Sequence, residues 1–123
     1  MRNTLKVTGM DITEDIRSYV SKKISTLDKL IDKNDTSALA QVEVGKGAHH
    51  KSGDVYMAEI TLHVAGADFR AEFESSTVYA AIDGVRERMY QELQGYKRKK
   101  VSLLRRGGAR IKDALRGIYR GRK

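Results

Sequence analysis

Apolar residues recur at helical spacing over residues 77–100. They fall at steps of four and three, which places them in one stripe along a helix: Val78, Ile82, Val85, Met89, Leu93 and Tyr96. Ser76 or Thr77 precedes the stripe and can accept a hydrogen bond from an otherwise unpaired amide. The pattern predicts a helix over 77–100 that ends in four consecutive cations.

A second helical stripe begins after Thr13. Thr13 is a suitable helix cap, and Glu14 and Asp15 in the first turn complement the helix dipole. The stripe consists of Ile16, Val20, Ile24, Leu27 and Ile31. The pattern predicts a helix that runs to Ile31 and closes in the turn-forming residues 33–35.

Four other segments alternate between apolar and polar positions, as half-buried strands do. They cover residues 3–9, 38–44, 56–64 and 69–73. Gly66-Ala67 between the last two suits a two-residue type II′ hairpin loop with Gly first. This loop predicts that Val64 faces Phe69, with the apolar residues of both strands on one face.

The polar face of these strands is acidic. It carries Glu43, Glu59, Glu72 and Glu74, together with Gln41, Thr61, His63 and Arg70. RNA-binding sheets of the RRM type stack bases on exposed aromatic side chains, and this face has none. If the chain binds RNA, the outward sides of the helices and the C-terminal segment must do so.

The element order β-α-β-β-β-α predicts an α+β fold. One face of a four-stranded sheet is apolar, and two helices are available to cover it. A chain of 123 residues suits a single domain. We expect residues 1–100 to form this domain and residues 101–123 to form a basic C-terminal arm.

Positive charge is concentrated at the C-terminal end. The formal net charge is +8; residues 1–96 carry 12 Lys/Arg against 15 Asp/Glu, and residues 97–123 carry 12 Lys/Arg against Asp113 alone. Dense cations suit a polyanion, because each neutralised phosphate releases condensed counterions. A merely solubilising tail is the alternative, but solubility does not require cations this dense.

The structure of the arm stays open at this point. After Gly107-Gly108, the residues Ile111, Leu115 and Ile118 repeat at helical spacing among cations. An amphipathic helix that orders on RNA and a disordered cationic tail are equally compatible with this pattern. A membrane-surface helix is less favoured, since a large aromatic anchor is lacking on its apolar face.

Other classes of site find little support. The chain has no Cys, no nucleophile-base pair in a supporting context and no phosphate-loop spacing, so we expect neither an enzyme nor a cofactor. His49-His50 lacks a third ligand nearby in sequence, so no metal site is expected. No apolar run is long enough for a signal peptide or a membrane span, and we expect a cytoplasmic protein without membrane contact.

Three residues of the 77–100 helix have more than one interpretation. Tyr79 and Tyr90 could stack on bases or pack between the helix and the sheet; we favour packing for Tyr79 and leave Tyr90 open. Asp83 lies in the first half of the helix, where complementation of the helix dipole explains it.

Three motifs resemble one family. Ile12-Thr13-Glu14 opens the first helix, residues 60–64 read ITLHV, and residues 79–84 read YAAIDG. In this strand order they resemble the ribosome hibernation-promoting factors, also called the ribosome-associated inhibitor (factor Y) or sigma-54 modulation family, in its short form. The resemblance covers roughly residues 3–100.

The resemblance implies a fold like a double-stranded-RNA-binding domain and a site on ribosomal RNA of the small subunit. That site is the channel for mRNA and tRNA near the decoding centre. Lys22, Lys23, Arg88, Lys97 and Lys99 match family positions that contact ribosomal RNA, whereas Gln91 and Gly95 replace cations common in relatives. With the other cations of the helices and the arm, the predicted RNA-binding residues are Lys22, Lys23, Lys29, Arg86, Arg88, Lys97, Arg98, Lys99, Lys100, Arg105, Arg106 and Arg110.

The resemblance also implies a function. We expect a translation inhibitor that stabilises inactive ribosomes, takes no small-molecule substrate and is a monomer off the ribosome. The family's second, ribosome-pairing domain has no counterpart in these 123 residues. Two alternatives remain open: a module that binds structured RNA or acts as an assembly factor, and a protein-interaction modulator of transcription.

Overall fold

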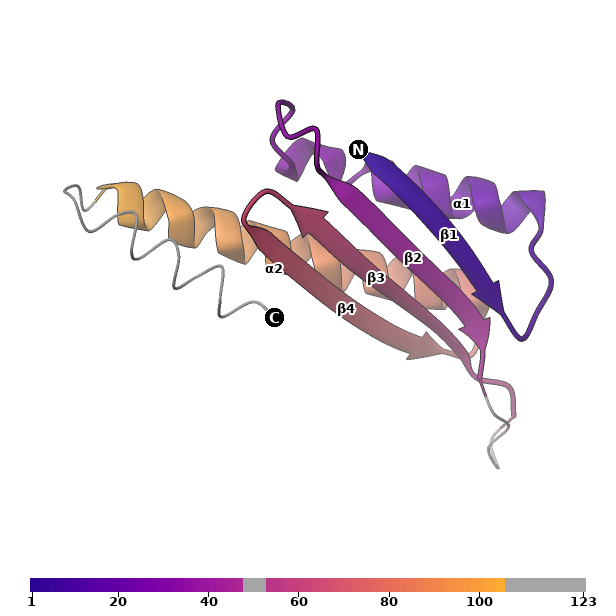
Figure 1. Cartoon of the computed structure of the whole chain (residues 1–123). Helices are drawn as coiled ribbons and strands as arrows, with labels where there is room; N and C mark the ends of the chain where they lie inside the picture. Colours follow the sequence, from indigo (N-terminus) through magenta and orange to yellow (C-terminus); the bar gives the residue numbers. More distant parts are fainter. Residues whose placement is uncertain (48–52, 106–123) are drawn as a thin grey trace.

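The protein is a four-stranded sheet with two helices on one face (Figure 1). The computed structural model describes residues 1–47 and 53–105, with the backbone alone for 101–105. Along the chain the elements are β1 (Arg2–Thr8), α1 (Glu14–Ser25), the 3-10 turn η1 (Asp28–Leu30), β2 (Leu39–Lys46), β3 (Tyr56–Val64), β4 (Ala67–Ser75) and α2 (Val78–Arg105). The strands are ordered β1-β2-β3-β4, with β1 parallel to β2 and the other pairs antiparallel. This arrangement confirms the predicted fold class.

The core lies between the sheet and the helices, where both apolar stripes meet the apolar face of the strands. Burial of these side chains is the main favourable term in the folding of such a domain. The buried side chains include Ile16, Val20 and Ile24 of α1, Val42, Val44, Ile60, Leu62 and Phe69 of the strands, and Ile82, Val85, Met89 and Leu93 of α2. The periodicities in the sequence therefore identified the correct faces.

Helix α1 ends earlier than predicted, at Ser25 instead of Ile31. The hydroxyls of Ser25 and Thr26 donate to the carbonyls of Lys22 and Lys23, at 2.7 and 2.6 Å. The Thr26 amide also donates to Lys23. Such local bonds compete with the helical ladder and tighten its last turn. Leu27 remains buried, but it belongs to the turn before η1.

The hairpin between β3 and β4 is present, but the predicted register is wrong by two residues. Val64 faces Ala67, and Leu62 faces Phe69. Gly66 has a φ of 82°, and no non-glycine residue of the described chain has a positive φ. The positive φ therefore lies at the second loop position, as in a type II turn. A shift of two leaves every side chain on its face, so the hydrophobic pattern could not reveal the error.

The carboxylate of Asp35 ties this hairpin to the loop before β2. Its Oδ2 accepts from the Ala65 amide at 2.8 Å, and its Oδ1 accepts from the hydroxyl and the amide of Ser37. The Ser37 hydroxyl, and after it the Ala65 amide, lower the pKa of Asp35 below its ordinary value of 3.8. Hydrogen bonds to the charged form have this effect.

Helix α2 crosses the sheet and packs most closely at Gly84. The Thr77 hydroxyl accepts from the Ala80 amide at its start, and the helix runs to Arg105, past the predicted end at Lys100. A Cβ built on Gly84 would lie 2.2 Å from the Phe73 ring, whereas a Cβ on Gly95 would meet nothing within 4 Å. The absence of a side chain at position 84 thus lets Phe73 fit against the helix.

These two glycines give a matched pair of variants. For Gly84→Ala, overpacking costs about 1–3 kcal/mol and should outweigh the gain in helix propensity of about 1 kcal/mol. For Gly95→Ala, only the propensity gain of about 0.5–1 kcal/mol applies. We expect urea unfolding to show a lower stability for the first variant and a higher stability for the second. Stabilisation by both substitutions would contradict the close contact at Phe73.

Asp35 predicts a pH dependence of stability. Because its pKa is lowered in the folded state, the carboxylate stabilises the fold above the ordinary value of 3.8. This contribution is lost as the pH falls through the lowered folded-state pKa. In Asp35→Asn we expect a smaller loss of melting temperature on acidification below about pH 4 than in the unsubstituted protein. Identical acid profiles would rule out the tether as an acid-sensitive element.

Candidate nucleic-acid interface

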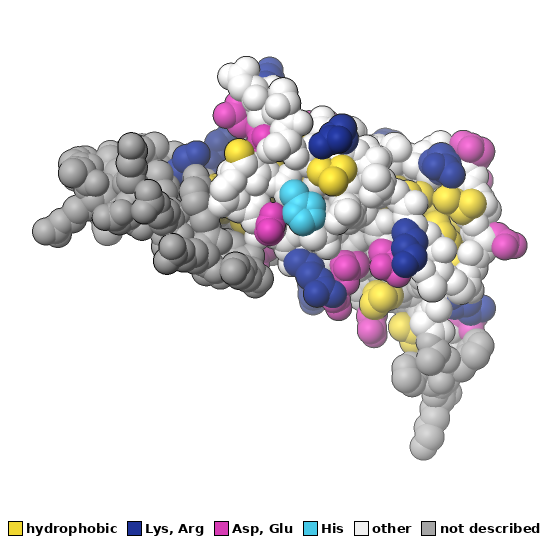
Figure 2. All heavy atoms as spheres, viewed as in Figure 1, with side chains coloured by type: hydrophobic (Ala, Val, Ile, Leu, Met, Phe, Trp, Pro, Cys, Tyr) yellow, Lys and Arg dark blue, Asp and Glu magenta, His cyan; other side chains and the backbone are white. Residues whose placement is uncertain are grey.

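The outer face of the sheet is acidic, as predicted. Figure 2 shows this face, where acidic and basic side chains lie together over the strands. Glu59 and Glu72 stand opposite each other on β3 and β4, and Arg70 lies between them, with its Nη2 at 2.7 and 2.8 Å from their carboxylates. Arg70 is thus already paired. Arg2 and Lys6 of β1 lie on the same face, so among the described strand residues it carries three cations against five carboxylates, Glu43, Glu59, Asp68, Glu72 and Glu74, and is acidic on balance.

On the opposite side of the molecule, α1 and α2 lie side by side and run in the same direction. Tyr19 lies beside Asp83, and Thr26 lies beside Arg86. We call this contact the helix seam; it consists of Tyr19, Lys23, Thr26, Lys29, Tyr79, Asp83, Arg86 and Tyr90. Three of the predicted RNA-binding residues, Lys23, Lys29 and Arg86, belong to it.

At one end of the helix seam, Asp83 holds two side chains of α1. Its Oδ1 accepts from the Tyr19 hydroxyl at 2.6 Å and lies 3.2 Å from the Lys23 ammonium. The hydrogen bond to Asp83 raises the pKa of Tyr19 above 10.0, so the phenol remains a neutral donor. Tyr19 also meets the Tyr79 ring edge-on, with the ring centroids 4.9 Å apart. The charge of Lys23 is therefore partly neutralised within the protein.

At the other end of the helix seam, the Tyr90 ring receives two cations. The guanidinium of Arg86 lies 4.5 Å from its centroid, and the ammonium of Lys29 lies 5.3 Å away. Arg86 also donates to the Thr26 hydroxyl at 2.7 Å, and its side chain is only 20% exposed. Such contacts favour a fixed position for the guanidinium. Tyr90 is half-buried and packs against the core, which answers the question left open by the sequence.

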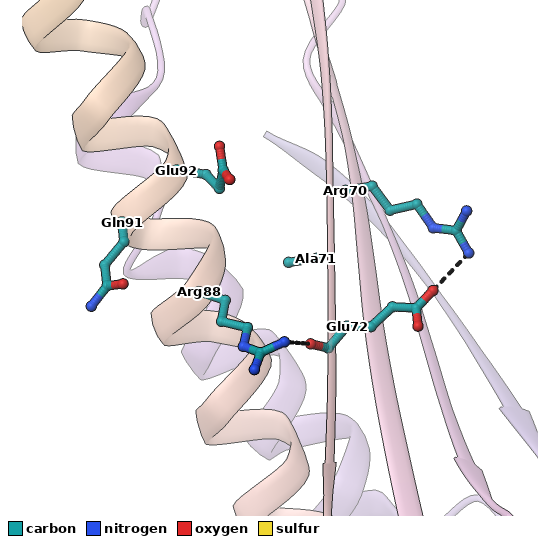
Figure 3. Close-up of a pocket in the computed structure, with 6 residues that line it drawn as sticks. All are labelled: Arg70, Ala71, Glu72, Arg88, Gln91 and Glu92. Carbon is teal, nitrogen blue, oxygen red and sulfur yellow. Dashed lines mark hydrogen bonds and ion pairs between the residues drawn. The ribbon is translucent and has the colours of Figure 1, made fainter. Parts of the chain in front are cut away.

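The structure places Arg88 on the other flank of α2. Arg88 is two residues from Arg86, or about 200° around the helix. Its Nη1 donates to the Glu72 carbonyl of β4 at 2.8 Å (Figure 3). Its guanidinium also lies 5.0 Å from the centroid of the Phe73 ring. Gln91 and Glu92 line the same pocket of about 480 Å³. Arg88 is thus not brought together with the cations of the helix seam.

Four of the remaining predicted cations are exposed. Lys22 lies on the outer side of α1, and Lys97, Arg98 and Lys99 lie on α2; within the described residues, no ion pair of these four is formed. Lys97 and Lys100 line a groove of about 560 Å³ whose walls include Phe69 and Tyr96. Arg105 ends α2, and the predicted residues Arg106 and Arg110, like His49-His50, lie outside the described residues.

Tyr79 occupies a different place from the one expected. It packs on Tyr19 in the helix seam instead of between helix and sheet, and it is 40% exposed. Tyr19 and Asp83 are 64 residues apart in the chain, so the spacing of residues carries no signal for their hydrogen bond. The position of Tyr19 directly before the buried Val20 was the only sequence feature that pointed to a contact between Tyr19 and the other helix.

Two absences within the described residues bear on the kind of site. None of the helices in 1–47 and 53–105 combines the length and the apolar character needed to cross a membrane. Within the same ranges, no group of three or more His, Asp or Glu side chains could hold a metal ion.

These features define the class of protein: an α+β domain whose sheet face is acidic on balance and whose longest run of cations, 97–100, lies on a helix. Residues 4–101 match the family described as "Sigma 54 modulation protein / S30EA ribosomal protein", and the chain belongs to this family. The resemblance noted from the three sequence motifs is thereby confirmed.

Named relatives agree with this assignment. The chain is 32% identical over 105 residues to a "Ribosome hibernation promoting factor" of Azotobacter vinelandii, covering 85% of this chain and 89% of the relative. It is 33% identical over 98 residues to the protein of the same name from Escherichia coli K12, covering 77% and 94%. The crystal structure of the Thermus thermophilus Protein Y N-terminal domain has a TM-score of 0.64 at 27% identity and covers 78% of this chain and 99% of that one.

Arg88 and Lys22 differ in the role that the geometry gives them. Arg88→Gln removes a hydrogen bond to Glu72 and a cation over Phe73, so we expect a loss of stability of about 1 kcal/mol. Lys22→Gln removes an exposed charge and should change the stability by less than about 0.5 kcal/mol. Urea unfolding of the two variants measures this contrast. Equal stabilities would show that the Arg88 contact contributes nothing to the fold.

Proposed function

We propose that this chain binds the small ribosomal subunit through its helix side and its basic C-terminal residues. In the bound position it occupies the channel for mRNA and tRNA near the decoding centre. A domain in this position excludes the substrates of translation and keeps the ribosome inactive. The site of action is then the cytoplasm, where translating ribosomes are.

An uneven distribution of charge carries the proposal. Glu43, Glu59, Glu72 and Glu74 belong to the strands, whereas the exposed Lys22 and the run 97–100 belong to the helices. Residues 97–123 carry a net charge of +11, from 12 Lys/Arg and one Asp. An RNA wall would therefore attract the helix side and the C-terminal residues and repel the sheet face. The names of the relatives, ribosome hibernation promoting factors, support the ribosome as the RNA-containing partner.

The mechanism needs no chemical step. Contacts from cations to phosphates position a protein on RNA without reading sequence, and the shape of the RNA supplies specificity. Occlusion then follows from volume alone, because mRNA and tRNA cannot enter a channel that a folded domain fills.

The cations should not contribute equally. A phosphate that binds Lys23 must compete with Asp83, and one that binds Arg86 must compete with Thr26 and Tyr90. No described partner competes at Lys22, Lys97 or Lys99. We therefore assign most of the electrostatic affinity to the exposed cations and to the residues that follow α2.

The affinity for small subunits should depend strongly on the residues beyond α2. Residues 106–123 carry seven Lys/Arg against Asp113. If their deletion removes about five phosphate contacts, the slope of log affinity against log salt should fall by about 3 to 5 units. Filter binding to purified small subunits over a range of salt concentrations measures both quantities. An unchanged slope would place these residues away from the RNA.

A sheet-face variant is the matched control for this deletion. Glu59→Gln with Glu72→Gln changes the net charge on the face proposed to point away from RNA. We expect its salt slope and its inhibition of a purified translation system to match those of the unsubstituted protein. The same titration against naked ribosomal RNA distinguishes the proposed function from that of a general module for structured RNA. Such a module would bind naked ribosomal RNA and small subunits equally well.

A further inference from the structure

An exposed carboxylate lies within the surface that we propose faces RNA. The side chain of Asp83 is 49% exposed, and it lies beside Lys23 in the helix seam. A carboxylate there repels phosphate, so contact with the RNA backbone does not explain why Asp83 lies on this surface. Both described bonds of Asp83 reach Oδ1, from Tyr19 and Lys23, and no bond from a described residue reaches Oδ2. A carboxylate has about four acceptor sites, and Asp83 thus retains acceptor capacity toward the solvent.

An aromatic ring is exposed next to this carboxylate. Tyr79 is 40% exposed, one turn before Asp83 on α2, and Tyr19 supports it edge-on at an angle of 83°. The hydrogen bond from Tyr19 to Asp83 fixes the supporting ring. Exposed rings of this kind are platforms on which unpaired bases stack.

We propose that Tyr79 and Asp83 form a binding site for one unpaired nucleobase that carries an exocyclic amine. The base stacks on Tyr79, its amine donates to Asp83 Oδ2, and Lys23 and Lys22 lie on the α1 side for the adjoining phosphates. Adenine, cytosine and guanine have such an amine. Uracil has the O4 carbonyl at the position of the cytosine amine, and a carboxylate placed to accept from that amine repels O4. The inference rests on the proposed function in that it names what the helix seam reads on ribosomal RNA.

A matched pair of pyrimidine oligonucleotides tests the site on the full chain. Fluorescence anisotropy with oligo(C) and oligo(U) of about eight nucleotides compares bases that differ in an amine and a carbonyl. We expect oligo(C) to bind about tenfold more tightly, as a hydrogen bond to a charged group allows. In Asp83→Asn this ratio should fall to within about twofold, because an amide can donate to uracil as well as accept from cytosine.

Variants of Tyr79 test the stacking contact. Tyr79→Leu should lower the affinity for both oligonucleotides about fivefold or more. The factor should be the same at about 0.05 and 0.2 M salt, because stacking does not release counterions. Tyr79→Phe keeps the ring and should retain the affinity. Lys22→Gln is the electrostatic control, and its effect should shrink as salt rises. Circular dichroism melts show whether each variant is folded.

Three results would overturn the inference. The first is equal affinity of the unsubstituted protein for oligo(C) and oligo(U), together with an equal gain in affinity for both in Asp83→Asn. This result would mean that Asp83 only neutralises Lys23. The second is unchanged binding by Tyr79→Leu, and the third is no measurable binding of either oligonucleotide. Binding to small subunits is measured separately. Its loss with the base preference intact would remove the proposed function and leave the base site standing.

Discussion

The packing of α2 across the sheet is the constraint on which the other features depend. Val85 and Met89 are fully buried, and Gly84 brings the helix backbone against Phe73. Once this side of α2 faces the core, the directions of its other side chains follow from the helical repeat. Asp83 and Arg86 face α1, Arg88 faces the flank beside β4, and the cations after Tyr96 continue past the core. One buried stripe therefore decides which cations are exposed and which stabilise the fold.

The sequence predicted the faces of the elements better than their exact pairing. Periods of 2 and 3.6 residues record which side is buried, so the core and the fold class could be inferred. The hairpin register depends on which residue of the loop takes the positive φ, and both placements of Gly66 leave the same side chains in the core. The early end of α1 depends on the hydroxyls of Ser25 and Thr26, and apolar spacing does not report such bonds.

The candidate site was predictable only as a list of cations off the apolar stripes. Lys22 and Arg88 satisfy that criterion equally. Within the described residues, however, Lys22 forms no ion pair, whereas Arg88 donates to a carbonyl of β4. Lys23 and Arg86 are paired with residues about 60 positions away, which only the folded chain brings together. Counting basic residues therefore overestimates the charge available to phosphate.

Affinity and specificity have different origins in this arrangement. The helix seam contains Lys23, Lys29 and Arg86 against Asp83, a net charge of +2, so under the proposed function it would contribute less to salt-dependent binding than residues 97–123. Its geometry, however, is fixed by hydrogen bonds and ring contacts, and fixed groups discriminate between ligands better than mobile ones do. Residues 97–123 have the opposite composition, with a high charge. In the proposed mode of binding, the C-terminal residues would supply affinity for any RNA-rich surface, while the helix seam would limit which surface allows a close fit.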